Sequence, residues 1–173
     1  MTQSISIWVL ISLLLMNLPI NTPQAQWNYR EIAVAEGCDD ISGLPITFNL
    51  DFINDIQPLF NFYGCADCHD GSDGGLDLNV GGGPILLPLL GDASQQTGAP
   101  FVEPFDPDMS YLWEKINCDM PFSGARMPRT GGVVSTEDQG KIYDWIQQGA
   151  LGEFPPGLWY REIIYRNSFE GNR

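Results

Sequence analysis

Basic side chains are scarce in this sequence. Its 173 residues include 8 lysines and arginines against 22 aspartates and glutamates, which gives a formal net charge of −14. Phosphate groups would be repelled by such a chain, so the charge argues against binding to nucleic acid or to an anionic membrane surface. Two interpretations of the acidity remain: attraction of a basic partner, or a solvated surface that keeps the protein soluble.

Long hydrophobic runs are also lacking after the first 25 residues. The run at residues 5–18 is followed by prolines and small or polar residues up to Ala25, the order found in secretory signal peptides. No lysine or arginine precedes it, and it falls short of the roughly 20 apolar residues of a membrane-spanning helix. We therefore expect residues 1–25 to be a signal peptide and the protein to be exported, to the periplasm or outside a bacterial cell; an uncleaved anchor is the alternative.

Only four cysteines are present, Cys38, Cys65, Cys68 and Cys118. Exported thiols meet oxidising conditions, under which cysteines are normally paired or modified. The simplest prediction for Cys38 and Cys118 is a structural disulfide between the N-terminal arm and the loop before Met127. A free or redox-active pair is the alternative.

Apolar residues three and four positions apart predict three short helices. The helices are expected to begin at Asp55, at about Ser110 and at Ser135 or Thr136, and to end at Cys65, before Pro121 and at Gly149. Residues 46–52 alternate in polarity and predict a short extended segment, while the glycine-rich residues 70–100 predict a loop. We expect an N-terminal arm (26–51), one helical domain (52–151) and a C-terminal extension (152–173).

The sequence Cys65-Ala66-Asp67-Cys68-His69 is a CxxCH motif, which is typical of c-type haem attachment. At the end of a helix, two cysteines three apart point to one side and can each form a thioether with one porphyrin. The neighbouring imidazole then lies under the ring and can bind the iron. Since His69 is the only histidine, a histidine ligand can be no other residue.

Two other chemistries use a CxxC pair. Thioredoxin-like disulfide exchange requires a βαβ frame, which the pattern does not contain. A zinc site would have to gather Cys38 and Cys118 from distant segments without a second close pair. Covalent haem is therefore the favoured interpretation, with one haem c held through Cys65 and Cys68.

A c-type electron carrier usually has a sixth iron ligand, and no second imidazole exists here. The mature chain contains Met109, Met120 and Met127. Pro128 favours an extended backbone at Met127, which would present that side chain without a helix. A methionine is nevertheless more often core filler than ligand, so the residues alone leave the choice open.

Six ordered motifs give the chain a resemblance to single-haem, class I type cytochrome c domains of exported bacterial proteins. Besides CxxCH they are Ile56-Gln57-Pro58-Leu59-Phe60, Gly75-Leu76-Asp77-Leu78, the segment from Pro104 to Leu112, Arg126-Met127-Pro128 and Trp145-Ile146-Gln147-Gln148-Gly149-Ala150. The resemblance covers roughly residues 52–150, and only Phe105 departs from it, at a position where glycine is usual. It implies an all-α, cytochrome c-like fold with long loops around one haem, and it makes Met127 the distal ligand.

The function implied is electron transport between Fe(II) and Fe(III), not catalysis, with His69 and Met127 on the metal. An exposed haem edge would meet a redox partner with a basic docking surface. Either Arg126 or Arg129 is expected to pair with a haem propionate or to face solvent. The residues expected to line the pocket or the helix contacts are Leu76, Leu78, Leu112, Trp113, Ile142 and Trp145. Two alternatives remain, a peroxidase or gas sensor with an open iron, and a subunit of a haem-conducting assembly.

Overall fold

The computed structural model describes residues 29–71, 75–78, 86–130 and 132–152. Within these ranges every regular element is a helix, and other backbone pairing is limited to isolated bridges. A mainly helical architecture, as the sequence predicts, is therefore confirmed for this part of the chain. The predicted signal peptide and residues 153–173 of the predicted extension lie outside the described residues. Over those same described ranges, no helix has both the length and the apolar character needed to cross a membrane.

The first helical segment begins earlier than predicted. A π-helical turn, η2 (Phe52–Ile56), precedes α2 (Gln57–Phe62). Asp51, not Asp55, is the N-cap: its carboxylate accepts a hydrogen bond from Asn54 N–H at 3.0 Å, and Asp55 Oδ2 accepts one from Asp51 N–H at 2.8 Å. This reciprocal bonding works like a capping box and moves the helix start upstream.

Residues 46–52 were predicted to be extended, but the chain bends at Asn49, whose φ is 58°, and η2 begins at Phe52; residues 46–51 form no strand. Thr47 N–H donates to Asp144 Oδ2 at 2.6 Å, and Asn49 N–H donates to Gln148 Oε1 at 2.9 Å. Side chains of the last helix therefore satisfy these backbone donors, and no partner strand is required.

The other two predicted helices are confirmed as α4 (Tyr111–Asn117) and α5 (Thr136–Gln147). Ser135 caps α5, since its Oγ accepts a hydrogen bond from Asp138 N–H at 3.2 Å. A short 3-10 turn, η4 (Pro107–Met109), leads into α4. A further helix, α3 (Leu86–Gly91), lies inside the segment predicted to be loop. Pro88 interrupts the apolar run in the sequence, so no helix was predicted there. A proline is nevertheless tolerated in a first helical turn. The side chain of Leu89 is completely buried and anchors α3 in the core.

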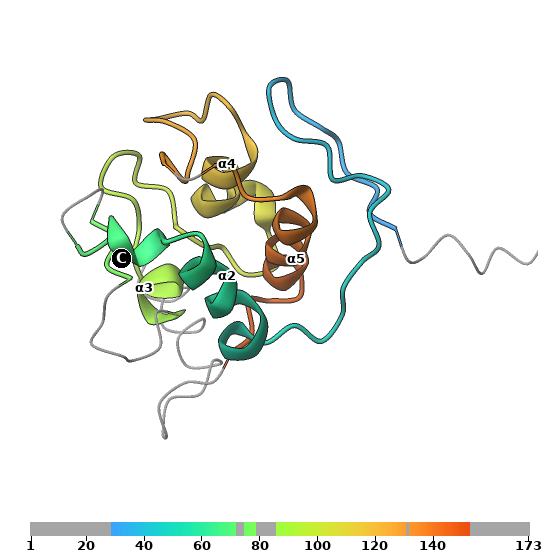
Figure 1. Cartoon of the computed structure of the whole chain (residues 1–173), viewed down its shortest axis with the longest axis horizontal. Coiled ribbons are helices and arrows are strands. Elements are labelled where there is room, and N and C mark those ends of the chain that lie inside the picture. Colours follow the sequence, from blue (N-terminus) through green and yellow to red (C-terminus); the bar gives the residue numbers. More distant parts are fainter. Residues whose placement is uncertain (1–28, 72–74, 79–85, 131, 153–173) are drawn as a thin grey trace, which may run out of the picture.

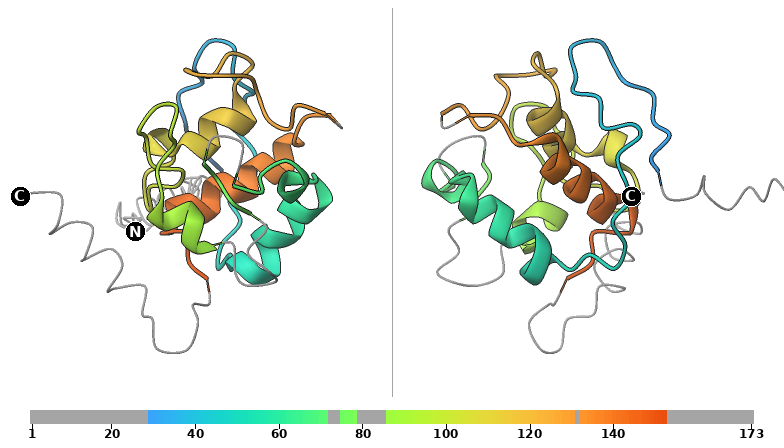
Figure 2. Two further views of the ribbon diagram at one scale, coloured as in Figure 1. Left: turned by 90° about the vertical axis from the view of Figure 1, so that its left-hand side faces the viewer. Right: turned by 45° about the vertical axis from the view of Figure 1, so that its right-hand side comes forward.

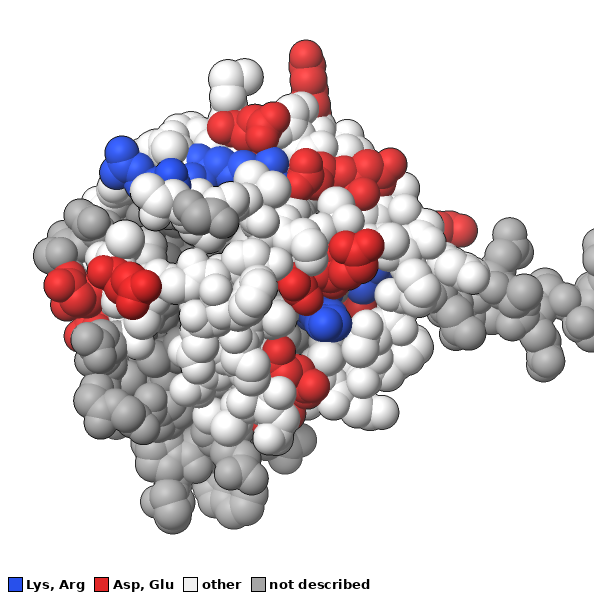
Figure 3. All heavy atoms as spheres, viewed as in Figure 1, with Lys and Arg blue, Asp and Glu red and all other residues white. Residues whose placement is uncertain are grey.

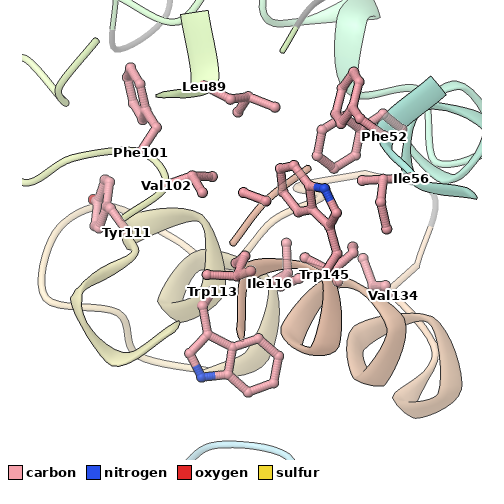
Figure 4. Close-up of a cluster of buried hydrophobic side chains, with 14 of the residues drawn as sticks. Phe52, Ile56, Leu89, Phe101, Val102, Tyr111, Trp113, Ile116, Val134 and Trp145 are labelled. Carbon is pink, nitrogen blue, oxygen red and sulfur yellow. The ribbon is translucent and has the colours of Figure 1, made fainter. Parts of the chain in front are cut away.

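The core lies where η2, α4 and α5 meet (Figure 4). The Trp145 ring is fully buried and its centroid lies 5.4 Å from that of Phe52, which in turn contacts Phe60 edge-on at 6.1 Å. The Trp145 indole N–H donates to Leu151 O at 2.8 Å, so the polar atom of this buried ring is satisfied. Of the predicted packing residues, all are buried except the half-buried Leu112.

The N-terminal arm, residues 29–50, lies beside α5 (Figure 1). Arg30 donates from Nε to Asp144 Oδ1 at 2.7 Å and from Nη2 to Asp144 Oδ2, and both side chains are buried. A Cβ on Gly140 would lie 2.9 Å from both Arg30 Nη atoms, so glycine allows the guanidinium to approach the helix. This two-pronged ion pair fastens the arm to α5.

Replacing Arg30 with methionine should lower the free energy of unfolding by about 3–5 kcal/mol, because it leaves the Asp144 carboxylate buried without its cation. Guanidinium or urea denaturation measures the loss. The matched control is Lys141→Met, which removes an exposed partner of Asp138 and should cost about 0–1 kcal/mol. Equal stability of the two variants would contradict the importance of the buried pair.

Candidate haem site

One tight turn after α2 brings Cys65, Cys68 and His69 together. Helix α2 ends at Phe62, and Gly64, which has a φ of 64°, precedes the 3-10 turn η3 (Cys65–Asp67). The N–H groups of Cys68 and His69 both donate to Cys65 O, at 3.4 and 3.1 Å. A Cβ on Gly64 would lie 2.9 Å from Asp67 Oδ2, so this left-handed position favours glycine on two counts.

The chain folds back after His69 and fixes that residue's backbone. Leu78 N–H donates to His69 O at 2.8 Å, and Gly71 N–H donates to Leu76 O at 3.1 Å. Leu76 and Leu78 are buried and anchor this return to the core. The motif is thus held from α2 on one side and from two buried leucines on the other.

The two motif thiols are free and differ in environment. Cys65 is half-buried and packs against the core, whereas Cys68 is exposed. Burial raises the pKa of the Cys65 thiol from 9.0 to about 11. Cysteines that exchange disulfides have lowered pKa values, because the thiolate is the reactive form. This environment disfavours the thioredoxin-like alternative.

The predicted disulfide between Cys38 and Cys118 is confirmed. Backbone hydrogen bonds flank it, from Asp39 N–H to Asn117 O at 3.0 Å and from Asp119 N–H to Gly37 O at 2.7 Å. Both sulfurs are bonded to each other, so the zinc site that would recruit these two cysteines is ruled out. Among the described residues, moreover, no three or more His, Cys, Asp or Glu side chains are grouped to hold a metal ion.

Met127 lies on the loop that follows α4. Its N–H donates to Lys115 O at 2.7 Å, and its side chain is half-buried. The side chains of the two other candidates point to solvent, since Met109 is 59% and Met120 is 86% exposed. Burial therefore favours Met127 among the three methionines. Whether Met127 and His69 share one iron stays a prediction.

The N-terminus of α5 links the loop of Met127 to the CxxCH turn. Tyr63, two residues before Cys65, donates from its hydroxyl to Asp138 Oδ2 at 2.8 Å and accepts from Ser135 N–H at 3.1 Å. In both views of Figure 2 the orange segment before α5 and the green turn after α2 lie on the same side of the molecule. The two predicted ligand segments are thus tied to a common element.

Arg126 does not face solvent, contrary to one of the two roles expected for it. Its side chain is only 12% exposed and forms ion pairs with Asp39 and, at 2.8 Å, with Asp119. Its Nε donates to Ile116 O at 3.1 Å. Arg129 is exposed. The cation next to Met127 is therefore engaged with the protein itself.

Sequence reasoning missed the pairing of Arg126 with Asp39 and the two polar side chains, Gln139 and Asn117, that hold Asp39 in place. Gln139 is fully buried; its Nε2 donates to Asp39 Oδ2 at 2.6 Å and its Oε1 accepts from Asn117 Nδ2 at 2.8 Å. Asn117 Nδ2 also donates to Asp39 O at 3.0 Å. A signal was present, since Gln139 stands three residues before Ile142 on the apolar face of α5, where a polar side chain needs a partner.

The donor set fits a covalently attached haem. The two free thiols stand three residues apart, an imidazole follows directly, and Cys65 and Ala66 pack against the hydrophobic core. Half-buried hydrophobic residues that pack on the core include Leu59, Tyr63, Cys65, Ala66, Leu90 and Leu112. Comparisons with protein families, with curated proteins and with solved structures find no match to this chain.

The hydrogen bond from Arg126 holds the pKa of Asp39 below its ordinary value of 3.8. A carboxyl whose pKa is lowered by folding adds stability above its unfolded pKa and loses it as the pH falls through the folded value. Wild-type unfolding free energy should therefore fall more steeply below about pH 3.8 than that of Asp39→Asn. Denaturation curves across acidic pH measure this, and parallel pH profiles would contradict it.

Proposed function

We propose that this chain is an exported, single-haem c-type cytochrome that carries electrons. The observation that carries the proposal is the division of the cysteines into two pairs. Cys38 and Cys118 are bonded to each other, whereas Cys65 and Cys68 remain free in one turn with the only histidine. Thiols in an exported protein are normally paired or modified, and thioether bonds to a porphyrin would account for both of these unpaired thiols.

Half-buried hydrophobic side chains that pack on the core support the same function. Residues of α2, α3 and α4 leave hydrophobic side chains half-buried beside the core, among them Leu59, Leu90 and Leu112. A porphyrin is a large apolar plate, and covering such side chains would remove their surface from water. Burial of the haem would also exclude water from the iron, and burial is one of the levers that set its potential.

Phe105 supports the finer assignment to a cytochrome c-like fold. It occupies the position where the resembled family usually has glycine, and its φ is 71°, in the left-handed region that glycine adopts most readily. Its N–H donates to Ile146 O at 2.8 Å, which joins this turn to α5. The local backbone thus has the conformation that the family's glycine would favour, although the residue differs.

In the proposed site, Cys65 and Cys68 attach the haem, His69 is the proximal ligand and Met127 is the distal ligand. Haem supplies one-electron chemistry, and a thioether ligand raises its reduction potential relative to a second imidazole. His69 N–H donates to Cys65 O and Leu78 N–H donates to His69 O, and these two backbone bonds orient the turn that carries His69. Because the chain would supply two ligands to the iron, an electron carrier is favoured over an enzyme.

Charge and compartment complete the proposal. Of the basic side chains that the structure describes, Arg30, Arg126 and Lys141 are paired with aspartates, and Figure 3 shows several acidic groups on the face drawn, beside one row of basic groups at the upper left. A net charge of −14 then favours a redox partner with a basic docking surface and salt-sensitive association. The disulfide fits an oxidising compartment outside the cytoplasm.

Protein produced with a c-type maturation system should be coloured, and its mass should exceed that of the processed polypeptide by one haem. A pyridine haemochrome spectrum measures the thioether-bound haem. The double variant Cys65→Ser/Cys68→Ser should lack covalent haem, whereas Met127→Leu, as a control outside the motif, should retain it. A colourless wild-type protein with the mass of the polypeptide alone would contradict the proposal.

Met127→Leu also tests the distal ligand. The variant should keep its haem but lose the weak long-wavelength band of ferric iron that marks thioether ligation, and its ferrous form should bind carbon monoxide readily. The matched control Met120→Leu changes an exposed methionine and should behave as wild type. Ready carbon monoxide binding by the wild type would instead favour the open-iron alternative, and a solution monomer would argue against an obligatory haem-conducting assembly.

A further inference from the structure

The disulfide docks the N-terminal arm against the end of α4. On its two sides, Asp39 N–H donates to Asn117 O at 3.0 Å and Asp119 N–H donates to Gly37 O at 2.7 Å. Asn117 Nδ2 donates to Asp39 O at 3.0 Å. The backbone of Asp39 is therefore fixed by one covalent and two hydrogen-bonded links to the same few residues.

The side chain of Asp39 is fixed as well. Its Oδ2 accepts from the fully buried Gln139 at 2.6 Å and from Arg126 Nη2. Gln139 Nε2 also donates to Val134 O at 2.8 Å. Rotation of this amide would therefore break its hydrogen bonds to both Asp39 Oδ2 and Val134 O. A carboxylate in this setting presents a charge at one defined point.

Arg126 connects the Asp39 carboxylate to the end of α4. The helix ends at Asn117, so the carbonyls of Lys115 and Ile116 have no partner within the helix. Ile116 O accepts from Arg126 Nε at 3.1 Å, and Lys115 O accepts from Met127 N–H at 2.7 Å. Two consecutive loop residues thus bind two consecutive helix carbonyls.

The two aspartate partners of Arg126 differ in how strongly they hold its side chain. The Asp119 side chain is 72% exposed, and ion pairs at such positions contribute little. Asp39 is 33% exposed and carries the additional bond from Gln139. Loss of the Asp39 charge would leave the exposed Asp119 as the only described ion-pair partner of Arg126.

We propose that Asp39, held beside the Cys38–Cys118 disulfide, is a positioning residue that fixes the Met127 loop through Arg126. The inference rests on the proposed function, because it concerns how firmly Met127 occupies an iron. A ligand supplied by the same chain competes with free ligands according to its effective concentration. A loop that samples more positions presents Met127 for a smaller fraction of the time, and outside ligands then bind more tightly.

The test compares Asp39→Asn with Asp40→Asn in the haem-loaded protein. Asp40 is the exposed neighbour, and the contact described for its side chain is with Ser42 N–H, so it is a matched control for charge and position. Haem content is measured first by pyridine haemochrome. Imidazole titration of the ferric protein and the thioether band then report on Met127, and hydrogen exchange of the Met127 N–H reports on the loop itself.

We expect Asp39→Asn to bind imidazole about tenfold more tightly than wild type, to weaken the thioether band and to exchange the Met127 N–H about tenfold faster, since one charge-assisted hydrogen bond is lost. Asp40→Asn should match wild type in all three measurements. Arg126→Lys, which keeps the charge but loses the two-pronged geometry, should fall between them and provides the test if Asp39→Asn does not fold.

The possible failures can be told apart. A wild-type protein without covalent haem overturns the proposed function and this inference together. Haem-loaded Asp39→Asn and Arg126→Lys that match Asp40→Asn in imidazole affinity and in exchange overturn this inference alone. A variant that unfolds more easily but keeps wild-type imidazole affinity also overturns it, because Asp39 would then be only a structural residue.

Discussion

The contact of Asp39 with Arg126 and Gln139 joins parts of the chain that are far apart in sequence. It connects the N-terminal arm, the loop after α4 and the first turn of α5 at one partly buried charge. The Cys38–Cys118 disulfide fixes the backbone beside it. The Arg30–Asp144 pair fastens the same arm to α5 at a second point. These polar links replace the regular strand pairing that the described arm lacks, and they set the position from which the Met127 loop departs.

The proposed haem attachment would explain why so little regular structure suffices. The helix before the motif, α2, has only six residues, and α3 also has six. Helices of this length are not stable alone and depend on tertiary packing. A covalently bound porphyrin would supply a large apolar surface in the region where α2, α3 and α4 leave half-buried leucines. The same group would make the protein an electron carrier, so stability and function would both depend on the CxxCH motif.

Local signals predicted much of the fold, whereas contacts between distant residues could not be predicted. Ser135 and the apolar spacing after it located α5, and CxxCH indicated the candidate site, because each signal lies within a few neighbouring residues. The role of Arg126 was missed because Asp39 stands 87 residues away. Helix α3 was missed because Pro88 interrupts a short apolar run among glycines, and only tertiary burial of Leu89 makes it a helix.

The central claim is that one iron is held by residues of two separate segments, with the porphyrin bonded to the cysteines of the CxxCH turn. A crystal structure with anomalous diffraction measured at the iron absorption edge tests this most directly. The account predicts a single iron peak between the His69 imidazole and the Met127 sulfur, with thioether bonds at Cys65 and Cys68. An iron-free structure in which Cys65 and Cys68 are bonded to each other would contradict it.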